Sequence, residues 1–564
     1  MIRDLAEINA YHPSEPESDD LILHLMKLPA RERLAEILAR PDAEAVVAAL
    51  PVQDFFLFVQ EIGPDDAGPL LALGKCEQLI HLFDIEWWSK DQLQPAKALQ
   101  WLERLAFASE ARLLEWLYRA DFELLVSLFK KWIHVVLTPE DVDPLEASEQ
   151  LPKHTLDDQF FWDTHYVQFE DFLSRLLSLI FEVHPGYYNE LMNQVIWGPE
   201  AEIEEDAYRF NRGRLEDQAI PNFYDAMTIY RSILREELPY NKGAENPEAG
   251  VSPPPSFAMA LLAGNDLLHE TLGEIHDTGE KDALRLELAS LANKVIIADG
   301  LALDEIGALR QAMEKTLAYV NLGLDVLSQG DLQDAAKVLR TVFFEHLFRL
   351  AHTRVMHLKG RLQKLICRGW LSRWPTGPKG LETDWMEAVE RLLQRTPRLV
   401  RPVSGPGSTQ GEDFFRDRRD LSRVKHSIDV ISALGSLAEG LSTQAANLSA
   451  RLWQDGQITS VEDLTLGVMI WTAAANQQIQ GIWKAESIRV DKWSEVFALL
   501  SPEAVVPSIR SWVEGIVHDE RRRDLIDAYL NPLFDEYAQE MSLFCAANPP
   551  DPRLVKFFAF GEAQ

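Results

Sequence analysis

The feature that most constrains this chain is a short phrase that recurs near its amino terminus. Between residues 28 and 73 a proline is followed by acids and then by apolar residues, and the prolines stand at positions 29, 41, 51 and 64. A proline fits the first turn of a helix because no N–H is needed there, and nearby acids interact favourably with the helix dipole. The phrase therefore predicts short helices that begin at these prolines, with a further start near Gly74.

Apolar residues follow each start at helical spacing, as at Phe55, Phe58, Val59 and Ile62. Helices of two to three turns are marginal alone in water, so they must stack on one another to bury their apolar sides. Alternate prolines, at positions 29 and 51, are 22 residues apart. We therefore expect a solenoid-like stack of helix pairs with a repeat of this length.

These residues also resemble known repeats. The phrases LPARERLAEIL, LPVQDFFLFVQEI and GPDDAGPLLAL are similar to the cytoplasmic helical-repeat domain of MgtE-type magnesium transporters and to the related repeats of the flagellar switch protein FliG. The likeness covers residues 21–135 and implies a helical-repeat fold. Magnesium transport and functional residues are not carried over, because the sequence has neither a membrane segment nor a recognisable nucleotide-sensing pair of domains.

The whole chain, including residues 202–230 and 291–340, resembles a bacterial family described as a domain of unknown function. That resemblance implies a helical fold and no particular activity. The remaining sequence agrees with an all-α fold, because helical periodicity continues through almost all of it. One small β-hairpin is expected near residues 155–170, where aromatic and β-branched residues cluster around Asp163 and Thr164.

Breaks in this periodicity predict the domain organisation. Stretches rich in Pro, Gly and Asn, such as LPYNKGAENPEAGVSPPPS and PVSGPGSTQGED, are typical of linkers. We expect a flexible tail at 1–20, the helical-repeat domain at 21–137, an acidic linker at 138–158, helical domains at 159–237, 257–401 and 414–564, and linkers at 238–256 and 402–413.

Composition limits the classes of function. The formal net charge of −34 argues against generic binding to nucleic acid or anionic lipid, because phosphates are repelled at long range. No run of about 18 apolar residues and no signal peptide are present, so we expect a cytoplasmic protein. Cys76, Cys367 and Cys545 stand far apart without metal-ligand spacing, which favours reduced, buried thiols.

A basic segment is the first candidate binding site. No acid occurs from Leu350 to Leu381, and Arg361, Lys364 and Arg368 share one helical face, with Trp370 and Trp374 following. This composition suits a phosphate-bearing or acidic partner. The alternative is a basic face that packs against the chain's own acidic helices, such as residues 138–158 or 200–206.

A carboxylate group is the second candidate. Asp299, Asp304 and Glu305 surround a glycine turn between two expected helices, where they could meet on a divalent cation. The calcium-loop pattern of alternating acids with a late glutamate is missing. Helix termination at Gly300, followed by capping of the next helix by Asp304 or Glu305, explains the same residues.

No motif nominates a catalytic residue, because GxSxG, HExxH and a dinucleotide-binding fingerprint are all missing from the sequence. No cofactor is indicated either. The leading hypothesis is a non-enzymatic scaffold or adaptor that binds another protein. A metal-regulated switch or enzyme with a carboxylate site between helical units is one alternative, and anion or RNA binding through residues 354–379 is another. Neither the oligomeric state nor the partner's identity follows from the sequence.

Overall fold

A computed structural model gives the structure of residues 21–561, apart from 22, 23, 26, 27, 139–150, 241, 243–265, 402–410, 456–462 and 545–548. The predicted tail and most of the three predicted linkers fall outside the described residues, so these assignments stay predictions. The chain divides into two compact units. Unit 1 comprises Met1–Arg231, Arg235–Val320 and Leu327–Arg349, and unit 2 comprises Ser232–Leu234, Asn321–Val326 and Leu350–Gln564.

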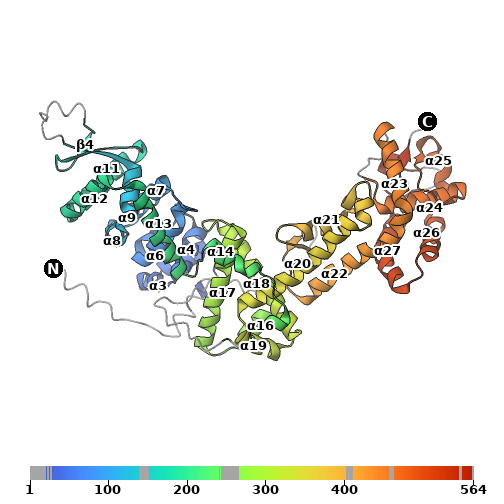
Figure 1. Cartoon of the computed structure of the whole chain (residues 1–564), viewed down its shortest axis with the longest axis horizontal. Helices are drawn as coiled ribbons and strands as arrows, with labels where there is room; N and C mark the ends of the chain where they lie inside the picture. The colour runs from blue at the N-terminus through green and yellow to red at the C-terminus, as the bar shows by residue number, and fades with distance from the viewer. Residues whose placement is uncertain are drawn as a thin grey trace. The chain divides into compact units, whose positions relative to one another are not determined.

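Unit 1 begins with the predicted short helices (Figure 1). They are α2 (Ala30–Leu38), α3 (Ala43–Ala49), α4 (Val52–Ile62), α5 (Gly68–Leu73), α6 (Cys76–Glu86), α7 (Pro95–Ala108), α8 (Glu110–Arg119) and α9 (Phe122–Trp132). Each packs on the helix two places further along, from α2 on α4 to α7 on α9. This alternation is that of a solenoid, and the predicted stack of short helices is confirmed.

The helix starts follow the prolines closely but not uniformly. Pro29 and Pro51 are the N-cap residues of α2 and α4, one position before the first helical residue. The helix after Pro64 begins only at Gly68, because a turn intervenes. The proline phrase therefore marks the approach to each helix, and the exact first residue depends on the turn that precedes it.

Aromatic side chains fill the centre of the stack. Phe83 and Trp87 of the α6 region are stacked with ring centroids 4.3 Å apart, and Trp116 of α8 packs edge-on against both rings. All three side chains are almost completely buried. The buried side chain of Gln78 donates hydrogen bonds to the carbonyl oxygens of Val47 and Leu50, at 2.8 and 2.7 Å, which satisfies the backbone where α3 ends.

The later helices of unit 1 pack on this stack and on one another. They are α11 (Glu170–Val183), α12 (Pro185–Trp197), α13 (Glu200–Asp217), α14 (Phe223–Ala226), α16 (Leu267–Gly273), α17 (Thr278–Asp299) and α19 (Leu332–Thr341), with the 3-10 helices η1 (Val167–Phe169), η2 (Met227–Tyr230) and η3 (Arg235–Glu237). Because α9 contacts both α12 and α13, the region predicted as a helical domain at 159–237 packs directly on the repeats.

The hairpin predicted near residues 155–170 is present. Strands β4 (His154–Thr155) and β5 (Phe160–Thr164) are antiparallel, and β3 (Ile133–Leu137) pairs with the other edge of β5. Asp163 and Thr164, around which the aromatic and β-branched residues cluster, lie within β5 and not in the turn. The turn is made by the residues between the two strands, where Asp157 Oδ1 accepts hydrogen bonds from the N–H groups of Gln159 and Phe160.

Unit 2 is also helical. Its helices are α21 (Thr383–Leu393), α22 (Arg418–Ala433), α23 (Gly435–Asp455), α24 (Leu466–Gln480), α25 (Trp493–Val496), α26 (Pro502–Ile516) and α27 (Glu520–Ser542), with η4 (Trp370–Arg373), η5 (Gly377–Gly380), η7 (Val490–Lys492), η8 (Phe497–Leu499) and η9 (Pro552–Leu554). Helices α18 (Ile306–Ser328) and α20 (Phe344–Arg368) contribute residues to both units. Trp471 is at the core, in contact with Phe534, Tyr537 and Phe557.

The remaining strands are short. They are β1 (Trp88–Ser89) with β2 (Gln92–Leu93), β6 (Leu399–Arg401) with β7 (Gly411–Asp413), and the parallel pair β8 (Ile488–Arg489) with β9 (Phe560–Gly561). The fold is therefore all-α with small strand pieces, as predicted. In the described ranges no single helix has the length and hydropathy of a membrane span, and the one helix pair that passes such a test together, α3 with α4, is bent by 114°.

Candidate functional site

Asp299, the first of the predicted metal ligands, is bound by groups of the protein itself. It is the last residue of α17, and its Oδ2 accepts a hydrogen bond from Lys315 Nζ at 2.6 Å. Its Oδ1 accepts one from the hydroxyl of Tyr230 at 2.6 Å. Lys315 is only 3% exposed, so this carboxylate is neutralised in the interior of unit 1.

The other two predicted ligands do not join Asp299. Asp304 pairs with Lys97 of α7 at 2.8 Å, and Glu305 is exposed. Gly300 ends α17 with a φ of 68°, a left-handed conformation that glycine adopts without strain. This agrees with the helix-termination alternative, and nowhere in the described part of the chain do three or more His, Cys, Asp or Glu side chains converge to hold a metal ion.

A cavity of about 270 Å³ lies between α17 and the start of α20. Its charged groups neutralise one another, because Lys294 pairs with Glu345 at 2.6 Å and Glu287 pairs with Lys242 at 2.6 Å. Burial raises the pKa of Glu287 and lowers the pKa of His346, which also lines the cavity. The ion pairs engage every carboxylate and ammonium group that lines the cavity, and Ser290 and His346 are its remaining polar side chains.

The predicted basic segment, residues 354–379, runs from α20 through η4 and η5, and its cations have different environments. Arg361 is partly buried and forms an ion pair with Asp429 of α22 at 2.6 Å. Lys364 and Arg368 are exposed and form no ion pair with any described residue. The alternative of packing against the chain's own acids therefore applies to Arg361 and to Arg373, which lies 3.6 Å from Glu439. Neither partner belongs to residues 138–158 or 200–206.

Trp370 and Trp374, which were predicted to contribute to binding, are core residues. They are 5% and 3% exposed, and their indole N–H groups donate to the carbonyl oxygens of Ile431 and Leu464 at 2.7 and 3.0 Å. A Cβ atom at Gly380 would lie 2.2 Å from the Trp374 ring, so glycine is required for this packing. The two indoles are packed in the core of unit 2 and are not available to a partner.

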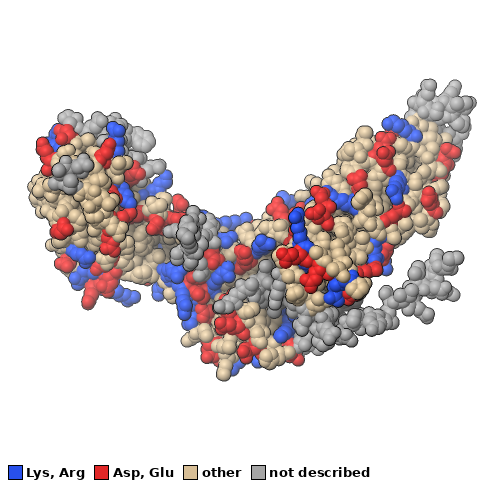
Figure 2. All heavy atoms as spheres, turned by 180° about the vertical axis from the view of Figure 1, so that it is seen from behind, with Lys and Arg blue, Asp and Glu red and all other residues tan. Residues whose placement is uncertain are grey.

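Helix α22 adds cations that the sequence analysis did not include. Arg419, Arg423, Lys425 and His426 are exposed on this helix, in the three turns that precede Asp429, the partner of Arg361 on α20. We define the basic face as Arg354, His357, Arg361, Lys364 and Arg368 of α20 with Arg419, Arg423, Lys425 and His426 of α22. The cations that α22 contributes can be recognised in the sequence as the basic run RDRRDLSRVKH, residues 416–426. In Figure 2 acidic and basic side chains are interspersed over the visible surface, so the excess acid is spread out.

Unit 1 presents a different surface, which the sequence analysis missed entirely. Tyr224 is 84% exposed, Phe223 is 49% exposed and Met227 is 37% exposed, all within α14 and the first residue of η2. The opposite side of the same segment is buried, because Ala226 and Ile229 have no exposed surface, and α14 packs on α17. We call Phe223, Tyr224 and Met227 the aromatic patch. Its signal in the sequence is the apolar cluster in NFYDAM, residues 222–227.

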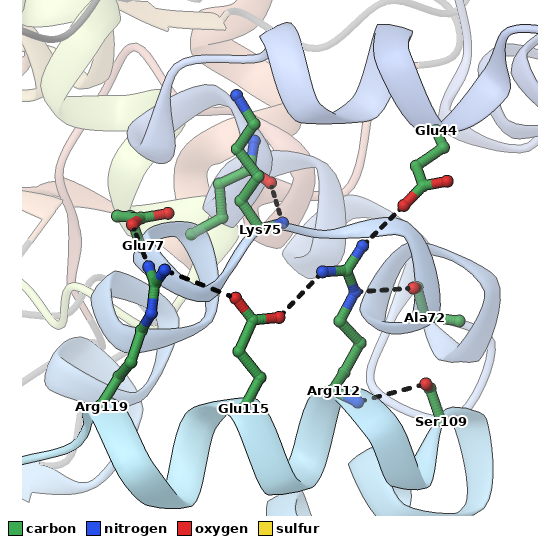
Figure 3. A network of polar contacts seen from close by, with 9 residues as sticks. Glu44, Ala72, Lys75, Glu77, Ser109, Arg112, Glu115 and Arg119 are labelled. Carbon is green, nitrogen blue, oxygen red and sulfur yellow. Dashed lines mark hydrogen bonds and ion pairs between the residues drawn. The ribbon is translucent and has the colours of Figure 1, made fainter. Parts of the chain in front are cut away.

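A polar network joins the repeats near the outside of the stack. Figure 3 shows Arg112 and Arg119 of α8 reaching toward the helices above, with Glu115 between them. Arg112 pairs with Glu44 of α3 at 2.7 Å and with Glu115 at 2.9 Å, and Arg119 pairs with Glu77 of α6 at 2.6 Å. These charges are already paired, so the network is better suited to holding helices together than to binding a ligand.

The cysteines differ from the expectation of buried thiols. Cys76 is buried, and burial raises the pKa of its thiol to about 12. Cys367 is exposed on α20, which corrects that prediction for this residue, and Cys545 lies outside the described residues.

The fold and these surfaces define an all-α protein built on stacked helical repeats, with no metal-ligating cluster among its described residues. The chain belongs to the family of unknown function DUF6178, which matches residues 15–561. No curated protein and no solved structure matches the chain.

Proposed function

We propose that this chain is a non-enzymatic cytoplasmic helical-repeat scaffold that binds another protein, and that the aromatic patch on α14 is a contact surface. The observation that carries the proposal is the exposure of Phe223, Tyr224 and Met227 on one short segment. Phe, Tyr and Met are enriched in the centres of protein interfaces, where burial of their large side chains contributes strongly to affinity.

The architecture supports this role. Each repeat helix packs on the second helix along, and the Arg112–Glu115–Arg119 network ties α8 to α3 and α6 (Figure 3). A stack held in this way presents surface residues on a stable framework, so little conformational entropy is lost when a partner binds. The resemblance of residues 21–135 to the MgtE and FliG repeats is consistent with such a framework and adds no activity.

The alternatives have less support. A metal-regulated switch or enzyme would need Asp299, Asp304 and Glu305 to converge, and the first two are engaged by lysines. RNA binding through residues 354–379 would have to overcome the repulsion of a chain with a net charge of −34.

The test compares two variants of the tagged full-length protein in its own cells. Phe223→Ser with Tyr224→Ser removes the two aromatic side chains of the patch, whereas Phe107→Ser removes an apolar side chain that is 95% exposed elsewhere in the same unit. We expect a stoichiometric partner to be recovered with the wild type and with Phe107→Ser, and to be lost with the double variant. Both variants should keep the wild-type circular dichroism and melting temperature. Equal recovery with all three proteins would overturn the proposal for this patch.

A further inference from the structure

The basic face of unit 2 carries an inference about the chemistry of the partner. Arg354, His357, Arg361, Lys364 and Arg368 follow one another on α20 at intervals of three and four residues, so they form a single stripe along one side of the helix. At 1.5 Å per residue the stripe is about 21 Å long. A stripe of this length spans about four turns of a facing helix.

Arg361, in the middle of the stripe, forms an ion pair, whereas the other arginines and the lysine of the stripe form none with the described residues. Arg361 is held by Asp429 at 2.6 Å, which ties α20 to α22 side by side. Arg354, Lys364 and Arg368 are exposed and have no ion pair with any residue in the described part of the chain. A rigid helix that displays unneutralised cations loses little entropy when it binds an anion.

Helix α22, which Asp429 joins to α20, carries further exposed cations. Arg419, Arg423 and Lys425 are exposed, and the closest carboxylate to any of them is Asp420, 4.0 Å from Arg423. Asp420 is itself 1% exposed, and Asp429 is already paired with Arg361. Local positive charge therefore persists in a chain whose composition is strongly acidic.

We propose that the basic face binds an acidic helical segment of a partner protein. Carboxylates placed three and four residues apart on a facing helix have the same spacing along the axis as the cations of α20, so each can meet a counterpart. A nucleic acid is the less favoured ligand because its uniform charge would be repelled by the acidic remainder of the chain. This inference rests on the proposed function and names the partner's chemistry.

The test measures binding of a labelled alanine-rich helical peptide, with glutamates three and four residues apart, to the full-length chain by fluorescence anisotropy. The charge-reversal variant is Arg354→Glu, Lys364→Glu and Arg368→Glu. Its matched control is Arg451→Glu, Lys492→Glu and Arg521→Glu, which reverses three exposed cations of unit 2 that are not members of the basic face and changes the net charge equally. Both variants are checked for wild-type thermal unfolding.

We expect the peptide to bind the wild type, to bind more weakly as salt rises, and to lose about tenfold or more in affinity with the charge-reversal variant. The control variant should stay within about twofold of the wild type. Asp429→Asn, which releases Arg361, should strengthen binding. No binding by the wild type, or equal losses with both triple variants, would overturn the proposal.

Two further readouts separate the alternatives. Tighter binding of single-stranded RNA than of the glutamate peptide would overturn the assignment to a protein segment. If the peptide test contradicts the proposal for the basic face, the proposal for the aromatic patch is not affected, because Phe223 and Tyr224 are tested by different variants. Conversely, loss of the partner in the patch variant with unchanged peptide binding would show that the two surfaces act separately.

Discussion

Lys315 Nζ lies 2.6 Å from Asp299 Oδ2 and 2.7 Å from the hydroxyl oxygen of Tyr230, in the interior of unit 1. The lysine donates to both oxygens, and the tyrosine hydroxyl donates to the second carboxylate oxygen. A carboxylate with an ammonium and a hydroxyl on its two oxygens is already satisfied. The contacts of Asp299 with Lys315 and Tyr230 therefore give this acid, at the end of α17, a role in stabilising the fold.

Replacement of Lys315 by Met should destabilise the protein. The substitution leaves Asp299 partly buried without its counter-charge, and the loss of one partner from a buried ion pair typically costs about 3 kcal/mol. Urea unfolding monitored by tryptophan fluorescence measures the change. The double variant Lys315→Met with Asp299→Asn should recover part of the loss, since no unpaired charge remains. A single variant as stable as the wild type would contradict this account of the pair.

Gly467 should not tolerate alanine. Its N–H donates to Glu382 Oε1 at 2.9 Å, and a Cβ atom there would lie 2.3 Å from the same oxygen. We expect Gly467→Ala to lower the free energy of unfolding by about 1–3 kcal/mol. The matched control is Gly440→Ala in α23, where a Cβ meets nothing within 4 Å, and it should stabilise by about 0.5–1 kcal/mol. Differential scanning calorimetry measures the melting temperatures of both variants. Equal melting temperatures for Gly467→Ala and Gly440→Ala would refute this prediction.

The pH dependence of stability should report on Glu382. Burial raises the pKa of this carboxyl above its ordinary value of 4.5, although the Tyr529 hydroxyl and the Gly467 N–H donate to it. The folded protein therefore holds the proton more tightly than the unfolded chain. Its contribution to stability is fully present below about pH 4.5 and is lost as the pH rises through the folded pKa.

Glu382→Gln cannot ionise, so it removes this contribution. The unfolding free energy of the wild type relative to Glu382→Gln should fall as the pH rises above 4.5. Glu495→Gln, at an exposed position in the same unit, serves as the control and should follow the wild-type curve. A wild-type curve parallel to that of Glu382→Gln at all pH values would show that Glu382 does not titrate differently on folding.

The two arginines of Figure 3 should contribute unequally. Arg112 is 23% exposed and meets two carboxylates and the Ala72 carbonyl oxygen, whereas Arg119 is 52% exposed. We expect Arg112→Met to cost about 1 kcal/mol and Arg119→Met less than about 0.5 kcal/mol. Both effects should shrink at high salt. Urea unfolding at low and high ionic strength measures them, and a larger loss for Arg119→Met would be the contrary result.

The helical stack could be predicted because its signals are local. Pro29 and Pro51 stand directly before α2 and α4, and the apolar spacing around Phe55 and Phe58 fits helices that must share a core. The small hairpin near residues 155–170 could be predicted from the aromatic and β-branched residues around Asp163 and Thr164, but the position of its turn could not. The actual turn depends on Asp157, whose side chain caps two backbone N–H groups.

The candidate surfaces were less predictable because they depend on contacts between distant residues. Arg361 and Asp429 are 68 positions apart, so their pairing and the contribution of α22 to the basic face follow only from packing. Trp370 and Trp374 follow the cations in sequence, yet Ile431 and Leu464 accept their N–H groups in the core. The exposure of Tyr224 likewise depends on which side of α14 packs against α17.

The central claim, that this chain binds another protein through the aromatic patch, is tested most directly by photo-cross-linking in living cells. A photoreactive phenylalanine analogue is placed at position 224 and, as a control, at position 107. The account predicts one discrete cross-linked product at position 224, identified by mass spectrometry, and none at position 107. No product at 224, or the same products at both positions, would contradict the claim.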